Sequence, residues 1–231
     1  MTTKIKFGTD GWRAIIADEF TVENVARVAF ATAQWIKKSG LDQRIAVGHD
    51  CRFAGELFAE TAAKVFAANG IHVLLSKGFV STPMVSFGTK LSGSSIGVII
   101  TASHNPPAYN GYKLKSEHGG PLSPELVQEI EDIIPENNSA DLSVSVQELI
   151  NSGKIEITPL EDLYVEHIEK NFDLNAIKNS KLNLAYDAMY GAGQNVMKRI
   201  LPNVTFLHCE YNPSFHGQAP EPIHKNLLEF S

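Results

Sequence analysis

The run Ile96–Ile100 (IGVII) contains only apolar residues and glycine, and serines and glycines precede it. An apolar run of this length beside turn residues is typical of a strand buried inside a sheet. A loop rich in hydroxyl groups, proline and glycine follows it, from Thr101 to Lys113. Parallel α/β proteins carry their chemistry in such loops, at the carboxyl edge of the sheet. The run therefore favours an α/β fold with a functional loop after residue 100.

Helical and strand patterns alternate along residues 1–155, and apolar and charged fractions of 43% and 20% suit a globular protein. Alternation of this kind predicts a three-layer α/β/α domain with a mostly parallel, mixed sheet. Thr21 is expected to cap one helix, and Gly70 to end another in a left-handed conformation. The expected helices cover residues 21–38, 56–69, 124–134 and 146–151, with one more from residue 82, and the expected strands cover 45–48, 71–75 and 96–100.

Residues 156–231 are predicted to form a second, incomplete α/β domain. Thr158–Glu161 (TPLE) has the pattern of a capping box before a helix. Further on, strands are expected at 182–186 and 204–207, with a helix at 194–201 between them. Two strands leave a sheet with an open edge and a half-covered face, so this domain is expected to need more chain.

The loop after residue 100 carries the candidate chemistry. Ser103 and His104 lie at its start, and Lys113 follows an Asn-Gly pair that favours a turn. The turn could bring the lysine ammonium back toward the serine. A serine hydroxyl is a weak nucleophile at neutral pH and needs a base, a metal or prior phosphorylation for phosphoryl chemistry.

Five segments, two of them in one loop, resemble motifs of one family, the α-D-phosphohexomutases, which include phosphoglucomutases and phosphomannomutases. Thr101–Pro106 (TASHNP) and Asn110–Lys113 (NGYK) resemble the family's phosphoserine loop. Phe7–Arg13 (FGTDGWR) is similar to its N-terminal signature, and Gly48–Arg52 (GHDCR) to the motif after its second strand. Asp187–Gly193 (DAMYGAG) is similar to the turn that opens its second domain. The resemblance implies that this chain corresponds to the N-terminal domain one of the family and to part of its domain two.

The resemblance also implies roles for individual residues. Ser103 would carry a phosphoryl group, donate it to a hexose phosphate, and recover the other phosphate from the bisphosphorylated sugar, moving phosphate between C1 and C6. Lys113 would be the general acid and base for the sugar hydroxyl. His104 would shape the loop near the phosphate, and Arg13 would bind substrate phosphate beside the phosphoserine.

The same resemblance implies a Mg²⁺ ion held by the phosphate on Ser103 and by carboxylates of a D-G-D-x-D-R loop. No such loop occurs in these 231 residues. The family places it shortly after a segment similar to Gly217–Pro222, so the chain is expected to be an N-terminal piece whose partners are the missing C-terminal domains of the same protein. Hexose 1-phosphate, hexose 6-phosphate and hexose bisphosphate are the expected ligands.

Composition and short motifs limit the partners, the cellular location and the functional classes that suit this chain. The net charge of −6 argues against a nucleic-acid partner, and no window suits a membrane span. Cys51 and Cys209 have no C-x-x-C spacing, and the N-terminus lacks a signal-peptide core, which favours a cytoplasmic location. A non-catalytic phosphosugar- or protein-binding module built from mutase domains remains the alternative. A nucleotide binder is disfavoured because neither glycine-rich nucleotide motif occurs.

Overall fold

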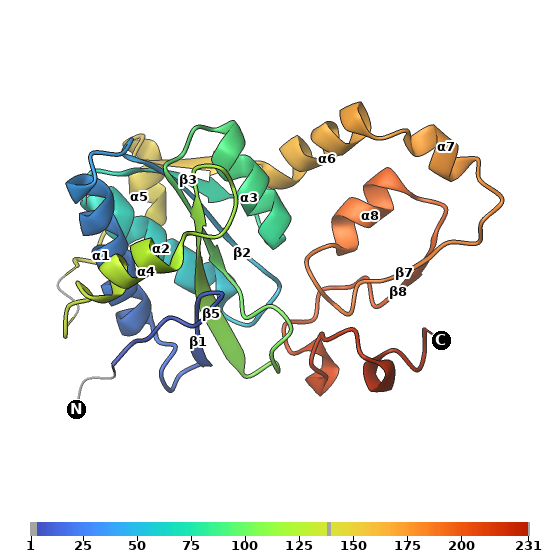
Figure 1. Cartoon of the computed structure of the whole chain (residues 1–231), viewed down its shortest axis with the longest axis horizontal. Coiled ribbons are helices and arrows are strands. Elements are labelled where there is room, and N and C mark those ends of the chain that lie inside the picture. The colour runs from blue at the N-terminus through green and yellow to red at the C-terminus, as the bar shows by residue number, and fades with distance from the viewer. Residues whose placement is uncertain (1–3, 138–139, 231) are drawn as a thin grey trace.

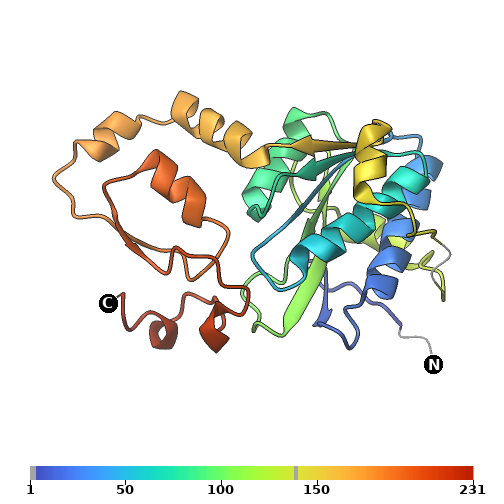
Figure 2. The same cartoon turned by 180° about the vertical axis from the view of Figure 1, so that it is seen from behind.

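The computed structural model describes residues 4–137 and 140–230, which form two lobes (Figures 1 and 2). The larger lobe contains a six-stranded sheet, and the smaller lobe contains a two-stranded sheet. Helix α6 (Leu160–Asn171) begins directly after the last strand of the large sheet and leads into the smaller lobe. None of the helices in the described part of the chain combines the length and apolar character that crossing a bilayer requires.

The strands of the large sheet are β1 (Trp12–Ile15), β2 (Arg44–His49), β3 (His72–Ser76), β4 (Ile96–Ile100), β5 (Tyr109–Ser116) and β6 (Ile155–Thr158), in the order β1-β5-β4-β2-β3-β6. Strands β4, β2, β3 and β6 pair in parallel, whereas β5 runs antiparallel to both β4 and β1. The prediction of a mostly parallel, mixed sheet is confirmed.

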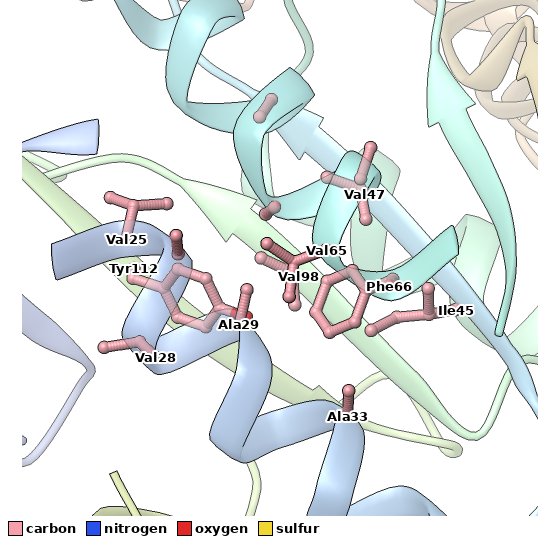
Figure 3. Packing of buried hydrophobic residues seen from close by; sticks show 14 of the residues in the cluster. Val25, Val28, Ala29, Ala33, Ile45, Val47, Val65, Phe66, Val98 and Tyr112 are labelled. Carbon is pink, nitrogen blue, oxygen red and sulfur yellow. The ribbon is translucent and has the colours of Figure 1, made fainter. Parts of the chain in front are cut away.

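Helices cover both faces of this sheet. They are α1 (Val22–Lys38), α2 (Gly55–Ala68), α4 (Pro124–Glu131) and α5 (Val146–Asn151) on one face, and α3 (Thr82–Leu91) on the other. Figure 3 shows Tyr112 of β5 among the side chains of α1, while Phe66 of α2 lies beside Ile45 and Val98. All four side chains are fully or almost fully buried. Alternate residues of β5 therefore enter this core, and the intervening ones face the side of α3.

Local signals in the sequence place several helix ends correctly. Thr21 caps α1, since its hydroxyl accepts a 3.2 Å hydrogen bond from the Asn24 backbone N–H. Gly70 follows α2 with a φ of 81°, the left-handed conformation expected at that end. Ser123 likewise caps α4, which ends at Glu131, three residues before the expected end.

The capping box expected at Thr158–Glu161 is wrong. Residues 155–158 form strand β6, which pairs with β3, and Thr158 Oγ1 donates to the Glu156 carbonyl. Pro159 occupies the N-cap position of α6 without a capping hydrogen bond. The pairing with β3 outweighs the local preference, and the large sheet runs three residues past residue 155. Residues 138 and 139 of the expected loop before α5 lie outside the described residues.

The smaller lobe contains α6, α7 (Leu174–Lys178), β7 (Ala185–Asp187), α8 (Gln194–Ile200), β8 (Thr205–Leu207) and two short 3₁₀ turns, Phe215–Gly217 and His224–Asn226. Strands β7 and β8 pair in parallel. An apolar cluster joins the lobes; its buried members are Val80, Met84, Val85 and Ile99 from the larger lobe with Leu160, Val165, Val196 and Ile200 from the smaller.

Candidate active site

Ser103 lies three residues beyond β4 in a backbone conformation that is uncommon for its residue type. Its φ is 57°, in the left-handed region that residues other than glycine rarely occupy. The side chain is exposed, and its Oγ lies 3.4 Å from His104 Nδ1. A strained backbone persists only where the surrounding structure holds it in place, and residues of this kind cluster at functional sites.

Thr101 and Asp50 hold the start of this loop. The Ser103 backbone N–H donates to Thr101 Oγ1 at 3.0 Å, and that hydroxyl donates to Asp50 Oδ2 at 2.5 Å. Asp50 follows β2, and its own N–H bonds the Ile100 carbonyl. Burial raises the pKa of Asp50, while the Arg52 charge and the Thr101 hydroxyl oppose that shift. The ends of two neighbouring parallel strands are thereby tied together under the serine.

Arg52 stabilises the rest of the loop through hydrogen bonds to its backbone. Its side chain is fully buried, and its two terminal nitrogens donate four hydrogen bonds of 2.7–3.0 Å to backbone carbonyls. These carbonyls belong to Ser103, Asn105, Pro106 and Tyr109. One guanidinium therefore binds both arms of the loop that carries the serine.

These contacts decide what Arg52 can do. A guanidinium has five N–H donors, and the four terminal ones match the four carbonyls. The fifth, Nε, has no hydrogen bond and lies 3.4 Å from Asp50 Oδ2, an ion-pair distance. The terminal donors are all taken and Nε is buried beside Asp50, so in this arrangement Arg52 supports the loop and offers no donor to a ligand in front of it.

Arg13, Asp10 and Lys113 form a connected charged group that also contacts the serine loop. Arg13 donates to Asn105 Oδ1 at 2.9 Å and to Asp10 Oδ2 at 3.1 Å. Lys113 Nζ donates to the same Asp10 oxygen at 2.5 Å. The Arg13 side chain is 25% exposed, which leaves it accessible to an anion. The structure thus connects Lys113 to the serine loop through two intervening side chains.

Strand pairing accounts for this arrangement. Arg13 of β1 is the partner of Gly111 in β5, and the Gly111 carbonyl accepts from the Thr101 N–H. Lys113, two residues further along β5, is the partner of Ile99. Three adjacent strands therefore deliver the arginine, the lysine and the serine loop to one region of the sheet.

Gly11 permits the close contact between Asp10 and Lys113. Its φ is 99°, and a Cβ there would lie 2.7 Å from the Tyr112 carbonyl oxygen and 2.8 Å from Lys113 Cγ. Only glycine fits both the conformation and the space. The turn can then lie flat against β5 and place the Asp10 carboxylate over the lysine, which is 5% exposed.

A cavity of about 400 Å³ lies between the serine and the smaller lobe. Ser103, Asp50 and Thr101 border it on one side, and the Asp187–Ala192 turn with Pro220 and Pro222 borders it on the other. Lys113 instead borders a neighbouring cavity of about 300 Å³ at the β1–β5 edge, together with Asp10 and Gly11. Neither His104 nor Arg13 lines either of these two cavities.

The residues at this site do not provide a magnesium shell. Asp50, the carboxylate beside the serine loop, is already engaged by Thr101 and Arg52. Within residues 4–137 and 140–230, no three His, Cys, Asp or Glu side chains gather in an arrangement suited to a metal ion. Hard cations require several oxygen ligands, which this part of the protein does not bring together.

Sequence reasoning found Ser103, His104, Lys113 and Arg13 but gave no role to Asp10 or to the buried Arg52. The Phe7–Arg13 and Gly48–Arg52 segments contain both residues, so their motifs were the available signal. These features define the class of the protein: an α/β protein of two lobes, with an exposed, strained serine in a loop at the edge of its large sheet, beside a cavity between the lobes.

Comparison with known proteins identifies the family. Residues 4–141 match the family model "Phosphoglucomutase/phosphomannomutase, alpha/beta/alpha domain I", and residues 162–231 match the corresponding domain II. The chain belongs to the phosphoglucomutase/phosphomannomutase family, as its motifs indicated.

Individual relatives agree. A phosphoglucosamine mutase of Methanococcus vannielii is 30% identical, with 96% of this chain and 46% of the relative covered. A phosphoglucomutase/phosphomannomutase of Thermococcus kodakarensis is 29% identical, with 97% and 49% covered. The crystal structure of a "putative phosphomannomutase" from Thermus thermophilus superimposes with a TM-score of 0.87 at 36% identity, covering 98% of this chain and 51% of that one. The chain spans about half the length of the relatives it matches.

Proposed function

We propose that this chain is the phosphoserine-bearing part of a phosphohexomutase that moves phosphate between C1 and C6 of a hexose phosphate. One observation carries the proposal: an exposed Ser103, held in a strained conformation by Thr101 and Arg52, faces a cavity between the lobes. Phosphoryl transfer depends mainly on positioning and charge neutralisation. The contacts that hold Ser103 supply the first, and Arg13, which donates to Asn105 of the same loop, is the nearest candidate for the second.

In the proposed reaction, the bond between phosphorus and Ser103 Oγ breaks, and a bond between phosphorus and a sugar hydroxyl oxygen forms. The hydroxyl proton passes to Lys113, a role that we assign to its neutral amine and that requires the ammonium to lose a proton beforehand; the ammonium formed in this step returns the proton to the sugar oxygen freed in the second transfer. The bisphosphorylated sugar then turns over, and its other phosphate returns to Ser103 Oγ while the freed sugar oxygen regains a proton. We assign binding of the phosphate to Arg13, which is partly exposed, and to His104, which lies beside Ser103 Oγ. Arg52 is not assigned this role because its terminal donors are occupied.

The whole protein would supply what these residues lack. We propose that Mg²⁺ binds the phosphate on Ser103 together with carboxylates from outside this chain, and that the protein acts in the cytoplasm. Residues 1–231 alone are then expected to show no mutase turnover with glucose 1-phosphate, a bisphosphate activator and Mg²⁺. The preferred sugar, whether glucose, mannose or glucosamine phosphate, is to be established by comparing turnover of all three.

Peptide mapping of the full-length protein purified from cells tests the proposal. Phosphate should be found on Ser103, and Ser103→Ala should reduce turnover by several orders of magnitude. Ser116→Ala, which removes a hydroxyl at the far end of β5, is the matched control and should keep turnover near wild type. An unphosphorylated Ser103 together with normal turnover of Ser103→Ala would instead favour the non-catalytic binding module.

A further inference from the structure

Phe215, in the smaller lobe, has an unusual backbone for a bulky residue. Its φ is 49°, the next residue, His216, has a φ of 50°, and Gly217 follows with 80°. Aromatic residues rarely occupy the left-handed region, and two consecutive non-glycine residues there require outside support. The Phe215 side chain is nevertheless 3% exposed, so this strained turn buries an aromatic ring.

Asn212 supports the turn. Its side-chain oxygen accepts from the backbone N–H and the hydroxyl of Ser214, at 3.0 and 2.9 Å. Its backbone carbonyl accepts from the Phe215 N–H at 3.0 Å. The His216 N–H donates to the same side-chain oxygen at 3.4 Å, so Asn212 holds the backbone on both sides of Phe215.

The ring lies over Arg52. The Arg52 Cζ atom is 5.1 Å from the centre of the Phe215 ring, within the range of a cation–π contact. All four terminal N–H groups of this guanidinium bind carbonyls of the serine loop, and the ring contacts the guanidinium while all four bonds remain in place. The smaller lobe therefore touches the one side chain that binds both arms of the serine loop.

A neighbouring contact reinforces this one. Gln194 Nε2 of α8 lies 3.7 Å from Sγ of Cys51, the residue before Arg52. In addition, the rings of Phe79 and Tyr211 stack across the lobes with centroids 5.8 Å apart. The smaller lobe thus contacts two consecutive residues of the segment that supports Ser103.

We infer that Phe215 is a positioning residue, which acts through Arg52 to hold the serine loop in its strained shape when the smaller lobe is seated. The four carbonyls converge on Arg52, so a guanidinium free to tilt could not satisfy all of them at once. The ring limits that tilt. Packing of the smaller lobe against the larger one would then hold Ser103 in the conformation described above. The consequence for phosphoryl transfer rests on the proposed function, whereas the effect on the loop does not.

Hydrogen exchange of the 231-residue chain tests the effect on the loop. Phe215→Leu keeps an apolar side chain but removes the ring, and should speed exchange of the Asn105 and Tyr109 amides several-fold. Both amides bond carbonyls within the loop, those of Ala102 and Pro106. Phe215→Tyr keeps the ring and should restore slow exchange. Phe172→Leu, at an exposed ring in the same lobe, is the matched control and should change neither amide.

Wild-type exchange in Phe215→Leu, or equally fast exchange in Phe215→Tyr, would overturn the inference. If Phe215→Leu unfolds the smaller lobe, Phe215→Met takes its place, because the flexible methionine side chain can fill the space left by the ring. Arg52→Lys provides a second route: lysine cannot bind four carbonyls, so the loop should exchange quickly, and adding the Phe215 substitution should then have no further effect on it. Additive effects of the two substitutions would refute coupling through Arg52.

Turnover of the full-length protein gives the functional readout. Phe215→Leu should lower kcat roughly tenfold or more with little change in KM, because a mispositioned nucleophile affects the transition state more than binding. A change in KM alone would contradict a positioning role. If the wild-type protein has no phosphate on Ser103 and no turnover, the proposed function fails, and the exchange experiment still decides the inference.

Discussion

The Lys113 ammonium and the Asp10 carboxylate are joined by a 2.5 Å hydrogen bond between residues 103 positions apart in the chain. The same carboxylate oxygen also accepts from Arg13 at 3.1 Å. Burial alone would raise the pKa of Asp10, but the hydrogen bond and charge of Lys113, with the charges of Lys115 and Arg13, lower it. Asp10 therefore stays ionised at neutral pH and fixes the positions of two cations beside the serine loop.

Replacing Lys113 with methionine should lower kcat of the full-length protein by about 10²–10⁴-fold and change KM far less, because a proton-transfer group acts mainly in the transition state. Lys115→Met controls for lost packing: Lys115 lies on the same face of β5 and is 6% exposed, against 5% for Lys113. Steady-state kinetics of both variants would decide. A rise in KM at unchanged kcat would reassign Lys113 to binding.

Gly11→Ala should reduce the free energy of unfolding by an amount on the order of 1–3 kcal/mol. The alanine would have to adopt a φ of 99°, and its methyl group would lie 2.7 Å from a backbone oxygen. Gly120→Ala is a suitable control, since the nearest atom to a Cβ there is 3.9 Å away. Chemical denaturation measures both, and equal stabilities of the two variants would show that the turn at Gly11 can relax.

Thr101→Val should destabilise the chain by about 1–3 kcal/mol. The substitution preserves shape but removes the hydroxyl that accepts from the Ser103 N–H and donates to Asp50. Thr101→Ser keeps that hydroxyl and should recover most of the loss. Denaturant titrations compare the variants, and a valine variant as stable as wild type would mean that water replaces the hydroxyl.

His208 should make the stability of the smaller lobe depend on pH. Burial lowers its pKa, but the hydrogen bond to Asp187 at 2.9 Å and the nearby Glu229 carboxylate outweigh burial and raise the pKa above its ordinary 6.5. A raised native pKa means that the folded state binds the proton more tightly. The stabilisation is thus complete below pH 6.5 and disappears as the pH rises through the native pKa.

Thermal unfolding of wild type and His208→Gln at a series of pH values measures this effect. The difference between their midpoints should be largest on the acidic side and should shrink on the alkaline side. His118→Gln, at a histidine with an 83% exposed side chain, should show no such trend. A constant difference across the series would rule out the proton as its source.

The sequence predicted those elements whose signals are local. The Thr21 cap, Gly70 after α2 and the apolar run of β4 each depend on residues adjacent in the chain, and the structure confirms them. The error at Thr158–Glu161 has the opposite origin. Pairing with β3, more than 70 residues earlier, determines the conformation of residues 155–158, and no local pattern contains that information.

Arg52 shows why part of the site could not be predicted. In the sequence, Arg52 follows Asp50 by two positions, a spacing that suggests a solvated ion pair. The structure buries it because four carbonyls from residues 51 to 57 positions further along return to it. Burial of a guanidinium depends on partners of this kind, and backbone carbonyls carry no signature in a sequence.

The alternation of side chains along β5 has a further consequence for where related chains can differ in length. Tyr112 lies in the core between α1 and the sheet, and Lys113, the next residue, points to the opposite side. One extra residue inside β5, between Tyr109 and Tyr112, would exchange the two, sending the ammonium into the core and the ring out of it. A related chain can therefore vary the length of the loop before Tyr109 freely, but inside the strand it keeps both groups in place only if the number of residues changes by an even number or a bulge absorbs the odd residue.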